Sequence, residues 1–181
     1  IQVETPPAET PVVHPHAHSA VGIDRGVAVF AAVSDGSTIA SISPLKTSLR
    51  KLRVAQRALA RKKRGSKNRR RARNRVQQIH RKVANIRRDF QHKSSTTIAK
   101  NHGTVVLEKL EVANMSRSAA GTLSEPGKNV AAKSGLNRGI LDQGWYSFEQ
   151  MLSYKLAKNG GQLVFVPAAY TSQRCSSCGH T

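Results

Sequence analysis

The chain has 181 residues, of which 30 are Lys or Arg and 10 are Asp or Glu, so its formal net charge is +20. This length suits one domain with a proper core, with or without an insertion. Aromatic residues make up only 4% of the chain, which argues against single-strand binding that relies mainly on base stacking. No apolar run approaches the ~20 residues of a membrane span, and the polar, Pro-rich N-terminus does not resemble a signal peptide. We therefore expect no membrane association.

The first 19 residues differ in composition from the rest of the chain. Residues 1–3 look like the end of a strand, and residues 4–19 are rich in proline and carry three alternate histidines, His14, His16 and His18. We interpret residues 1–19 as the end of a preceding domain followed by a mobile linker.

Three short strands are predicted next. An apolar run at 21–24 ends in Asp24, a second run covers 27–33, and a third strand covers 38–42. Asp35-Gly36 is a typical hairpin turn between the second and third strands. We expect a three-stranded antiparallel meander.

A strongly basic segment follows, because 20 of the 30 Lys and Arg residues lie between Lys46 and Lys93 with one acid, Asp89. The segment has a net charge of +19, whereas the rest of the chain is nearly neutral. A nucleic-acid duplex presents one phosphate charge per ~1.7 Å of axis and is the natural partner of such a surface. A solvated charged face or a basic tail is the alternative, although a solvated face usually mixes both signs of charge.

The basic segment also carries helical periodicity. One apolar seam is formed by Ala72, Val76, Ile79, Val83, Ile86 and Phe90, and an earlier one by Leu45, Leu49, Leu52 and Leu59. A break at 64–66 separates the two seams. We predict two long antiparallel helices that pack through these seams and turn arginine outward.

The remaining third of the chain alternates between predicted strands and helices. Residues 104–108 form a buried strand that ends in Glu108, residues 111–138 are loop-like, and a helix follows around residues 145–156. Residues 162–166 form the fifth strand. The order β-β-β-α-β-α-β predicts an α/β fold with a mixed sheet, in which right-handed crossovers place the fourth strand parallel to the first.

Two acids at strand ends are the candidate catalytic residues. Asp24 and Glu108 would meet at the carboxyl edge of the sheet, where ligands commonly bind. Carboxylates there suit Mg²⁺ or Mn²⁺, and such ions support phosphodiester hydrolysis. Acids also cap strands and begin turns, so a purely structural role stays open from the residues alone. Cys175 and Cys178 form one Cys-x-x-Cys pair, which is half of a zinc site.

Four motifs in one order make the chain resemble a known family. They are VGIDRGV (21–27), RRDFQHKS (87–94), VVLEKL (105–110) and YTSQRCSSCGH (170–180). Together they resemble the TnpB (OrfB) proteins of bacterial insertion sequences, relatives of the type V CRISPR effector nucleases. The resemblance covers residues 20–181.

The resemblance implies an RNase H-like, RuvC-type core at 20–169, a basic helical insertion at 45–100 and the first half of a zinc ribbon at 170–181. In this family the core cuts DNA chosen by a guide RNA. Asp24 and Glu108 match catalytic acids that bind magnesium, and Cys175 and Cys178 match zinc ligands. The partners implied are DNA and guide RNA, and the location is the bacterial or archaeal cytoplasm with the nucleoid. The basic residues expected to bind nucleic acid are Arg50, Arg53, Arg57, Arg61, Lys62, Lys63, Arg64, Lys67, Arg69, Arg70, Arg71, Arg73, Arg75, Arg81, Arg87, Arg88 and Lys93.

The family's third catalytic acid and second Cys-x-x-Cys would follow Thr181. We therefore expect these 181 residues to bind nucleic acid without cutting it efficiently, and zinc to bind only if the ribbon is completed. Two alternatives remain: a non-catalytic RNA- or DNA-binding protein, or the remnant of a decayed transposon gene. Strand transfer shares the fold and metal chemistry, so the sequence does not separate cutting from joining.

Overall fold

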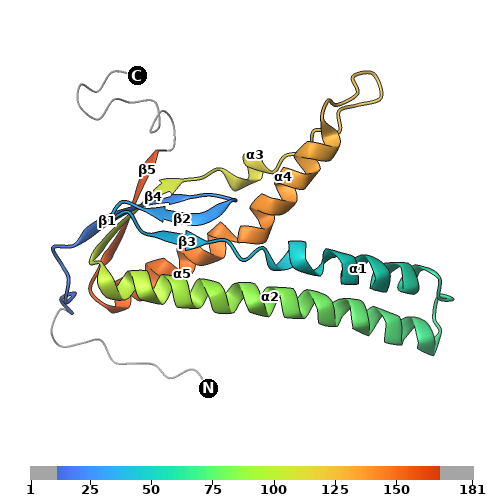
Figure 1. Ribbon diagram of the computed structural model, residues 1–181, viewed down its shortest axis with the longest axis horizontal. Coiled ribbons are helices and arrows are strands. Elements are labelled where there is room, and N and C mark those ends of the chain that lie inside the picture. Colours follow the sequence, from blue (N-terminus) through green and yellow to red (C-terminus); the bar gives the residue numbers. More distant parts are fainter. Residues whose placement is uncertain (1–11, 168–181) are drawn as a thin grey trace.

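The computed structural model describes residues 12–167 and builds them around a five-stranded mixed sheet (Figure 1). The order across the sheet is β3-β2-β1-β4-β5. β1 pairs antiparallel with β2, and β2 with β3, whereas β1, β4 and β5 run parallel. The predicted mixed sheet, with its fourth strand parallel to the first, is therefore confirmed. The bounds are β1 Ala20–Arg25, β2 Val29–Val33, β3 Thr38–Ala40, β4 Thr104–Lys109 and β5 Gln162–Pro167.

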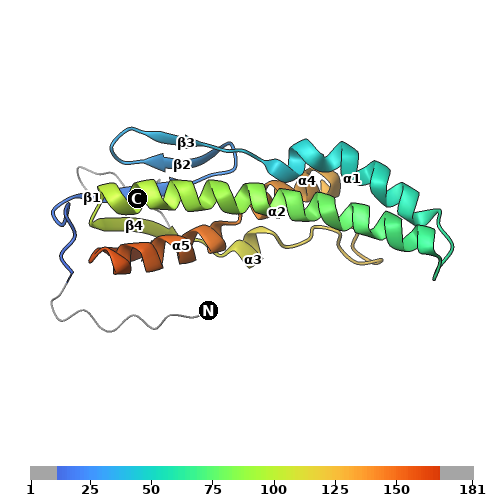
Figure 2. The same ribbon diagram turned by 90° about the horizontal axis from the view of Figure 1, so that it is seen from below.

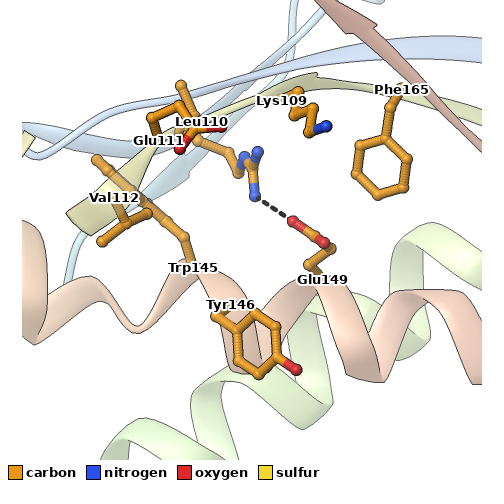
Figure 3. Close-up of a pocket in the computed structure, with 9 residues that line it drawn as sticks. Lys109, Leu110, Glu111, Val112, Trp145, Tyr146, Glu149 and Phe165 are labelled. Carbon is orange, nitrogen blue, oxygen red and sulfur yellow. Dashed lines mark hydrogen bonds and ion pairs between the residues drawn. The ribbon is translucent and has the colours of Figure 1, made fainter. Parts of the chain in front are cut away.

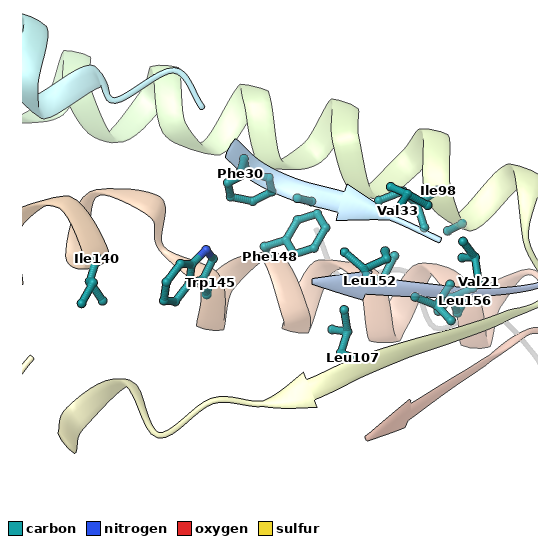
Figure 4. Packing of buried hydrophobic residues seen from close by; sticks show 14 residues of the cluster. Val21, Phe30, Val33, Ile98, Leu107, Ile140, Trp145, Phe148, Leu152 and Leu156 are labelled. Carbon is teal, nitrogen blue, oxygen red and sulfur yellow. The ribbon is translucent and has the colours of Figure 1, made fainter. Parts of the chain in front are cut away.

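One face of the sheet carries the core. Val21 and Ile23 of β1 and Val105 and Leu107 of β4 are at most 3% exposed, and they share a face because side chains alternate along a strand. Two helices supply the other side of this core, α2 (Lys67–Asn101) and α5 (Trp145–Lys158) (Figure 4). The opposite face of β1 and β4 is the one to which Asp24 and Glu108 belong.

Helix α5 follows the predicted apolar periodicity. Trp145, Phe148, Leu152 and Leu156 are all buried, at 3% exposure or less. Phe30 of β2 meets Phe148 edge to face, with ring centroids 5.0 Å apart, a favourable arrangement for aromatic rings. These contacts fix α5 against the sheet.

The predicted helical pair is also present. α1 (Pro44–Ala60) and α2 lie side by side and antiparallel, and they extend well beyond the sheet (Figures 1 and 2). The turn between them contains Gly65 at φ +79°, a conformation that favours glycine. Ser66 caps α2 by accepting a hydrogen bond from the Arg69 amide at 3.1 Å. Within residues 12–167 no helix is both long enough and apolar enough to cross a membrane.

The predicted seam between α1 and α2 is only partly buried. Leu52 and Val83 are 6% and 5% exposed, but Ile86 is 41% exposed. The predicted packing of the two helices through their seams is present, but it leaves Ile86 exposed. In a pair of helices each helix covers only a narrow stripe of its partner, whereas a bundle covers more of each helix, so part of the apolar surface of this pair stays exposed.

Residues 111–138 are not all loop-like as predicted. α3 (Val112–Met115) and α4 (Val130–Gln143) lie within or across that range. The glycines of α4 weaken its local helical signal, and tertiary packing overrides it. A Cβ at Gly139 would lie 2.9 Å from Val27 Cγ1, so glycine permits the close approach of α4 to the loop after β1.

The mobile linker predicted for residues 4–19 is also wrong for its described part, residues 12–19. His14 is 2% exposed and its Nε2 lies 2.9 Å from the Ala99 carbonyl oxygen. The Gly103 amide donates to the carbonyls of His16 and Ser19 at 3.1 and 3.0 Å. This segment therefore packs against the end of α2. The predicted strand end at 1–3, the Cys-x-x-Cys pair and residues 170–181 lie outside the described residues.

Candidate functional site

The two predicted acids lie at the same edge of the sheet. Ile23 pairs with Leu107 in the parallel ladder of β1 and β4. Asp24 follows Ile23 and Glu108 follows Leu107, so the two acids occupy equivalent positions on neighbouring strands. Ile23 and Leu107 point into the core, and the alternation of side chains turns the two acids toward the opposite face. Asp24 is exposed and Glu108 is half-buried. The predicted side-by-side placement of their strands is confirmed.

A buried arginine, which the sequence analysis did not single out, stands directly after Asp24. The side chain of Arg25 is only 1% exposed, and its Nη1 lies 3.3 Å from Glu149 Oε2 on α5 (the dashed line at Glu149 in Figure 3). Its Nη2 donates to the backbone carbonyl of Glu108. Arg25 therefore joins the ends of β1 and β4 to α5. The alternation that starts at Val21 and Ile23 was a local signal that places Arg25 on the core face, but nothing in the sequence indicated its partners Glu149 and Glu108.

Two opposing effects act on the pKa of Arg25, namely burial and the charges of nearby carboxylates. Burial lowers the pKa of the Arg25 guanidinium, while Glu149 and then Glu108 and Asp24 act in the opposite direction. Burial disfavours the charged form, and nearby anions favour it. Arg25 is therefore within electrostatic reach of both predicted catalytic acids.

A pocket of about 340 Å³ opens beside this ion pair, at the end of the strands on the helix side of the sheet (Figure 3). Its volume is within the range of small-molecule sites. Besides Arg25 and Glu149, its lining residues are Lys109, Leu110, Glu111, Val112, Trp145, Tyr146 and Phe165.

The acids offer oxygen ligands for a metal, but only two of them. Among residues 12–167 no group of three or more His, Cys, Asp or Glu side chains is placed to hold a metal ion. Magnesium is commonly bound through one or two carboxylates, with water and substrate phosphates completing its coordination. Asp24 and Glu108 fit that kind of open site better than a closed protein cage.

The basic residues lie almost entirely on the surface. Of the 17 residues predicted to bind nucleic acid, all but Arg69 and Arg87 are exposed. We call α1 together with residues 67–86 of α2 the basic arm. A groove of about 1050 Å³ lies between the two helices of the arm. Its lining includes the apolar residues Ala55 and Ile79 and the basic residues Arg50 and Arg75.

Arg69 and Arg87 have partners inside the protein. Arg69 Nη1 donates to the carbonyls of Leu59 and Lys62 at 3.2 and 3.0 Å, which closes the turn at the tip of the arm. Arg87 Nη2 lies 2.5 Å from Asp142 Oδ1 and its Nε donates to the Asp142 carbonyl at 2.7 Å. Both arginines have a structural task, whatever else they contact.

The sequence analysis missed a polar cluster at the end of α4, which we call the Asp142 hub and which consists of Asp142, Gln143 and Gly144 with the groups that they bind. Asp142 Oδ2 accepts the amides of Leu45 and Lys46 at 2.9 and 3.3 Å, so an α4 carboxylate caps the start of α1. Gln91 Nε2 donates to the carbonyls of Gln143 and Gly144 at 2.8 and 2.9 Å. The hub therefore joins α1, α2 and α4 at the base of the arm.

The motif at 87–94 acquires a physical meaning from this hub. Arg87, Phe90 and Gln91 lie on one side of α2 because they are three and four residues apart. Arg87 and Gln91 bind the hub, and Phe90 meets Phe30 edge to face at 4.9 Å. This spacing was the available signal, and it indicates anchoring of the arm on the core.

Residues 1–119 match the family model OrfB_IS605, described as "Probable transposase". The chain belongs to the OrfB family. Residues 145–181 also match the "Cas12f1-like, TNB domain" model. The motif-based resemblance is thus confirmed.

Individual relatives agree with membership of the OrfB family. The chain is 50% identical over 181 residues to "Putative RNA-guided DNA endonuclease InsQ" of Escherichia coli (strain K12), covering all of this chain and 45% of that protein. It is 34% identical over 166 residues to a Streptomyces pristinaespiralis protein with the same functional description, covering 91% of this chain and 38% of the relative. This OrfB chain thus spans less than half the length of either relative.

A solved structure supports the fold of this OrfB chain. The match is to "Cryo-EM structure of the Cas12f1-sgRNA-target DNA complex", with a TM-score of 0.50 and 22% identity, over 92% of this chain and 40% of that one. At this identity the likeness bears on the fold alone.

Proposed function

We propose that the chain forms the nuclease core of a transposon-encoded, RNA-guided DNA endonuclease, with an RNase H-like, RuvC-type architecture. The observation that carries this proposal is the pair of acids, Asp24 and Glu108, ending adjacent parallel strands next to an arm of high positive charge. The name of the 50% identical relative adds support, because it describes an RNA-guided DNA endonuclease.

In this proposal Asp24 and Glu108 hold Mg²⁺ or Mn²⁺ at the carboxyl edge of the sheet. The chemistry that such an ion supplies is activation of water and stabilisation of the leaving oxygen during phosphodiester hydrolysis. Both carboxylates lie on the face of the sheet opposite the apolar core, so the ion would be bound on that face. Cys175 and Cys178 would contribute to a zinc ribbon when two further ligands complete it.

The basic arm would bind the sugar–phosphate backbone of DNA, guide RNA or their heteroduplex. Its exposed arginines and lysines supply cations, and counterion release makes such binding strongly dependent on salt. Recognition would follow the shape and backbone of the duplex while base pairing supplies sequence. The product of the gene would then act in the nucleoid.

A non-catalytic nucleic-acid-binding protein is the second candidate. It is favoured by one observation: the described residues bring together two carboxylates and no group of three metal-binding side chains. Both candidates predict nucleic-acid binding, so cleavage has to decide between them.

The test compares Asp24→Asn with wild type in the product of the complete gene. We expect Mg²⁺-dependent DNA cleavage to be abolished while affinity for an RNA–DNA heteroduplex stays within about twofold, because Asn keeps the shape of the side chain but removes a charge that binds metal. Asp35→Asn is the matched control, since Asp35 lies in the exposed β2–β3 turn and its Oδ1 accepts the Ser37 amide at 2.8 Å. Cleavage that survives Asp24→Asn would refute the catalytic assignment.

A further inference from the structure

We propose that Arg25 is a positioning residue that fixes the two metal-binding acids relative to each other and to α5. This inference rests on the proposed function, because it concerns the same pair of acids. Arg25 lies next to Asp24 in β1, it donates to the backbone carbonyl of Glu108 in β4, and it pairs with Glu149 on α5. Arg25 thus follows one acid in the chain, binds the backbone of the other and links both strands to a helix of the core.

The placement of Arg25 follows from the strand register. Val21, Ile23 and Arg25 are the buried residues on the core face of β1, whereas Asp24 lies on the opposite, exposed face. The Arg25 side chain is therefore on the core side of the strand end that carries Asp24. The β1–β4 ladder pairs Ile23 with Leu107, its last pair. Beyond that pair, the hydrogen bond from Arg25 to the Glu108 carbonyl continues the connection between the two strands. At the level of the two acids, a side-chain hydrogen bond from Arg25 thus joins the strands in place of backbone pairing between them.

The energetic cost of this arrangement argues against a role in stability alone. Arg25 has a nearly fully buried side chain, and its Nε has no hydrogen-bond partner among the described residues. Buried ion pairs gain little over apolar side chains of similar volume, because removing two charges from water offsets their attraction. An apolar residue would serve the core at least as well, so the geometry points to a task at the strand ends.

The charge of Arg25 alone works against metal binding, because a cation repels a divalent ion. Glu149 balances that charge within the pair. Two effects would therefore be mixed in a single substitution: removing Arg25 loosens the acids but also removes a positive charge. A double substitution that removes both partners keeps the net charge constant and isolates the positioning effect.

The experiment measures Mn²⁺ affinity and amide hydrogen exchange in the 181-residue chain carrying Arg25→Met together with Glu149→Leu. We expect Mn²⁺ to bind about tenfold more weakly, the lower end of what is typical when residues that orient metal ligands are changed. Exchange at the amides of residues 24–26 and 108–110 should become faster. The thermal midpoint should stay close to that of wild type, because apolar side chains replace the buried pair.

The matched control removes an exposed ion pair of the same kind. Lys93 Nζ and Asp89 Oδ2 lie 2.8 Å apart on α2, with side chains 76% and 63% exposed, so Lys93→Met with Asp89→Leu changes the same charges away from the acids. This control should leave Mn²⁺ affinity unchanged. Arg25→Lys is a further variant, in case the double variant does not fold: it keeps the charge, but lacks the fork that reaches both partners, and it should also speed exchange at 108–110.

The outcomes separate this inference from the proposed function. One outcome would overturn the positioning role and leave the metal centre standing. In that outcome Asp24→Asn loses Mn²⁺ binding, whereas the double variant keeps both its Mn²⁺ affinity and its exchange at 108–110. Absence of Mn²⁺ binding in wild type, with exchange at 108–110 still faster in the double variant, would refute the metal centre and support Arg25 as the link between strands. A lower thermal midpoint without either local change would reduce Arg25 to a purely structural residue.

Discussion

The basic arm and the sheet with α5 are held together in different ways. The buried apolar residues of the arm are Pro44, Leu52, Ala55 and Val83, whereas the core cluster has fourteen buried members. In the arm almost every Arg and Lys is exposed, whereas Arg25 at the sheet is buried. The same residue type is therefore exposed in the arm, where we propose that it binds nucleic acid, and buried as an internal link at the sheet.

This contrast predicts that the arm and the core open with different free energies. Regions with few buried apolar contacts open locally at low cost, and the core opens only on global unfolding. Helix α2 belongs to both regions: Ile98 and Ala99 at its C-terminal end are in the core, whereas Lys67 at its start is exposed. The arm is thus an extension of a core helix, secured at its base by the Asp142 hub.

The largest expected effect is in the core, at Phe148. This side chain is fully buried and packs edge to face against Phe30. Phe148→Ala should lower the free energy of unfolding by about 3–5 kcal/mol, through lost burial and the cavity that remains. Val54→Ala in the arm is the control, since Val54 is 62% exposed, and it should change stability by less than about 0.5 kcal/mol. Urea unfolding curves measure both. Similar losses at the two positions would contradict the contrast between arm and core.

The next effect is expected at the junction between the two regions. Asp142→Asn should lower the free energy of unfolding by about 2 kcal/mol, because the partner charge of Arg87 is lost and the cap on α1 is weakened. The estimate is below that for a fully buried pair, because the Arg87 side chain is 25% exposed. Amide exchange in α1 should also become faster than in α5. Asp89→Asn, an exposed acid on the same helix pair, should do neither, and equal effects of the two substitutions would count against the hub.

Sequence reasoning predicted the elements whose signals are local. The seams of the arm and the apolar face from Trp145 to Leu156 follow from periodicity. The strands that end near Asp24 and Glu108 follow from short apolar runs. The structure contains all of these elements, although Ile86 is exposed. These features depend on neighbours a few residues away, so the pattern is readable in the sequence.

The missed features depend on contacts between distant residues. Asp142 binds Arg87 and the amide of Leu45, which are 55 and 97 residues away in the chain, and Arg25 meets Glu149 across 124 residues. No local pattern reports such pairs. The burial of His14 was missed for the same reason, because its partner is the Ala99 carbonyl, while the flanking prolines favoured a linker.

The arm should respond to substitution through binding more than through stability. Arg75→Ala, in the groove between α1 and α2, should weaken binding to a DNA duplex about eightfold at 0.1 M salt and reduce the slope of log affinity against log salt by about 0.9, the value for one lost phosphate contact. Arg138→Ala, an exposed arginine on α4 outside the arm, is the matched control. Fluorescence anisotropy at several salt concentrations measures both variants. A slope that is unchanged in Arg75→Ala would exclude this groove as a phosphate-binding surface.

The smallest effect is expected at the tip of the arm, where Ser66 caps α2. Ser66 Oγ accepts the Arg69 amide at 3.1 Å and donates to the Lys63 carbonyl at 2.8 Å. Ser66→Ala removes both bonds and should destabilise the first turn of α2 by about 1 kcal/mol. We expect the tip to open without the core, because few buried apolar contacts hold it. Amide exchange at residues 69–71 should therefore become about fivefold faster, while exchange in α5 should not change. Ser66→Asp restores a cap acceptor and should recover most of the protection. If Ser66→Ala instead lowered protection in α5 as well, the tip and the core would unfold as one unit, and the distinction between the two regions would not hold.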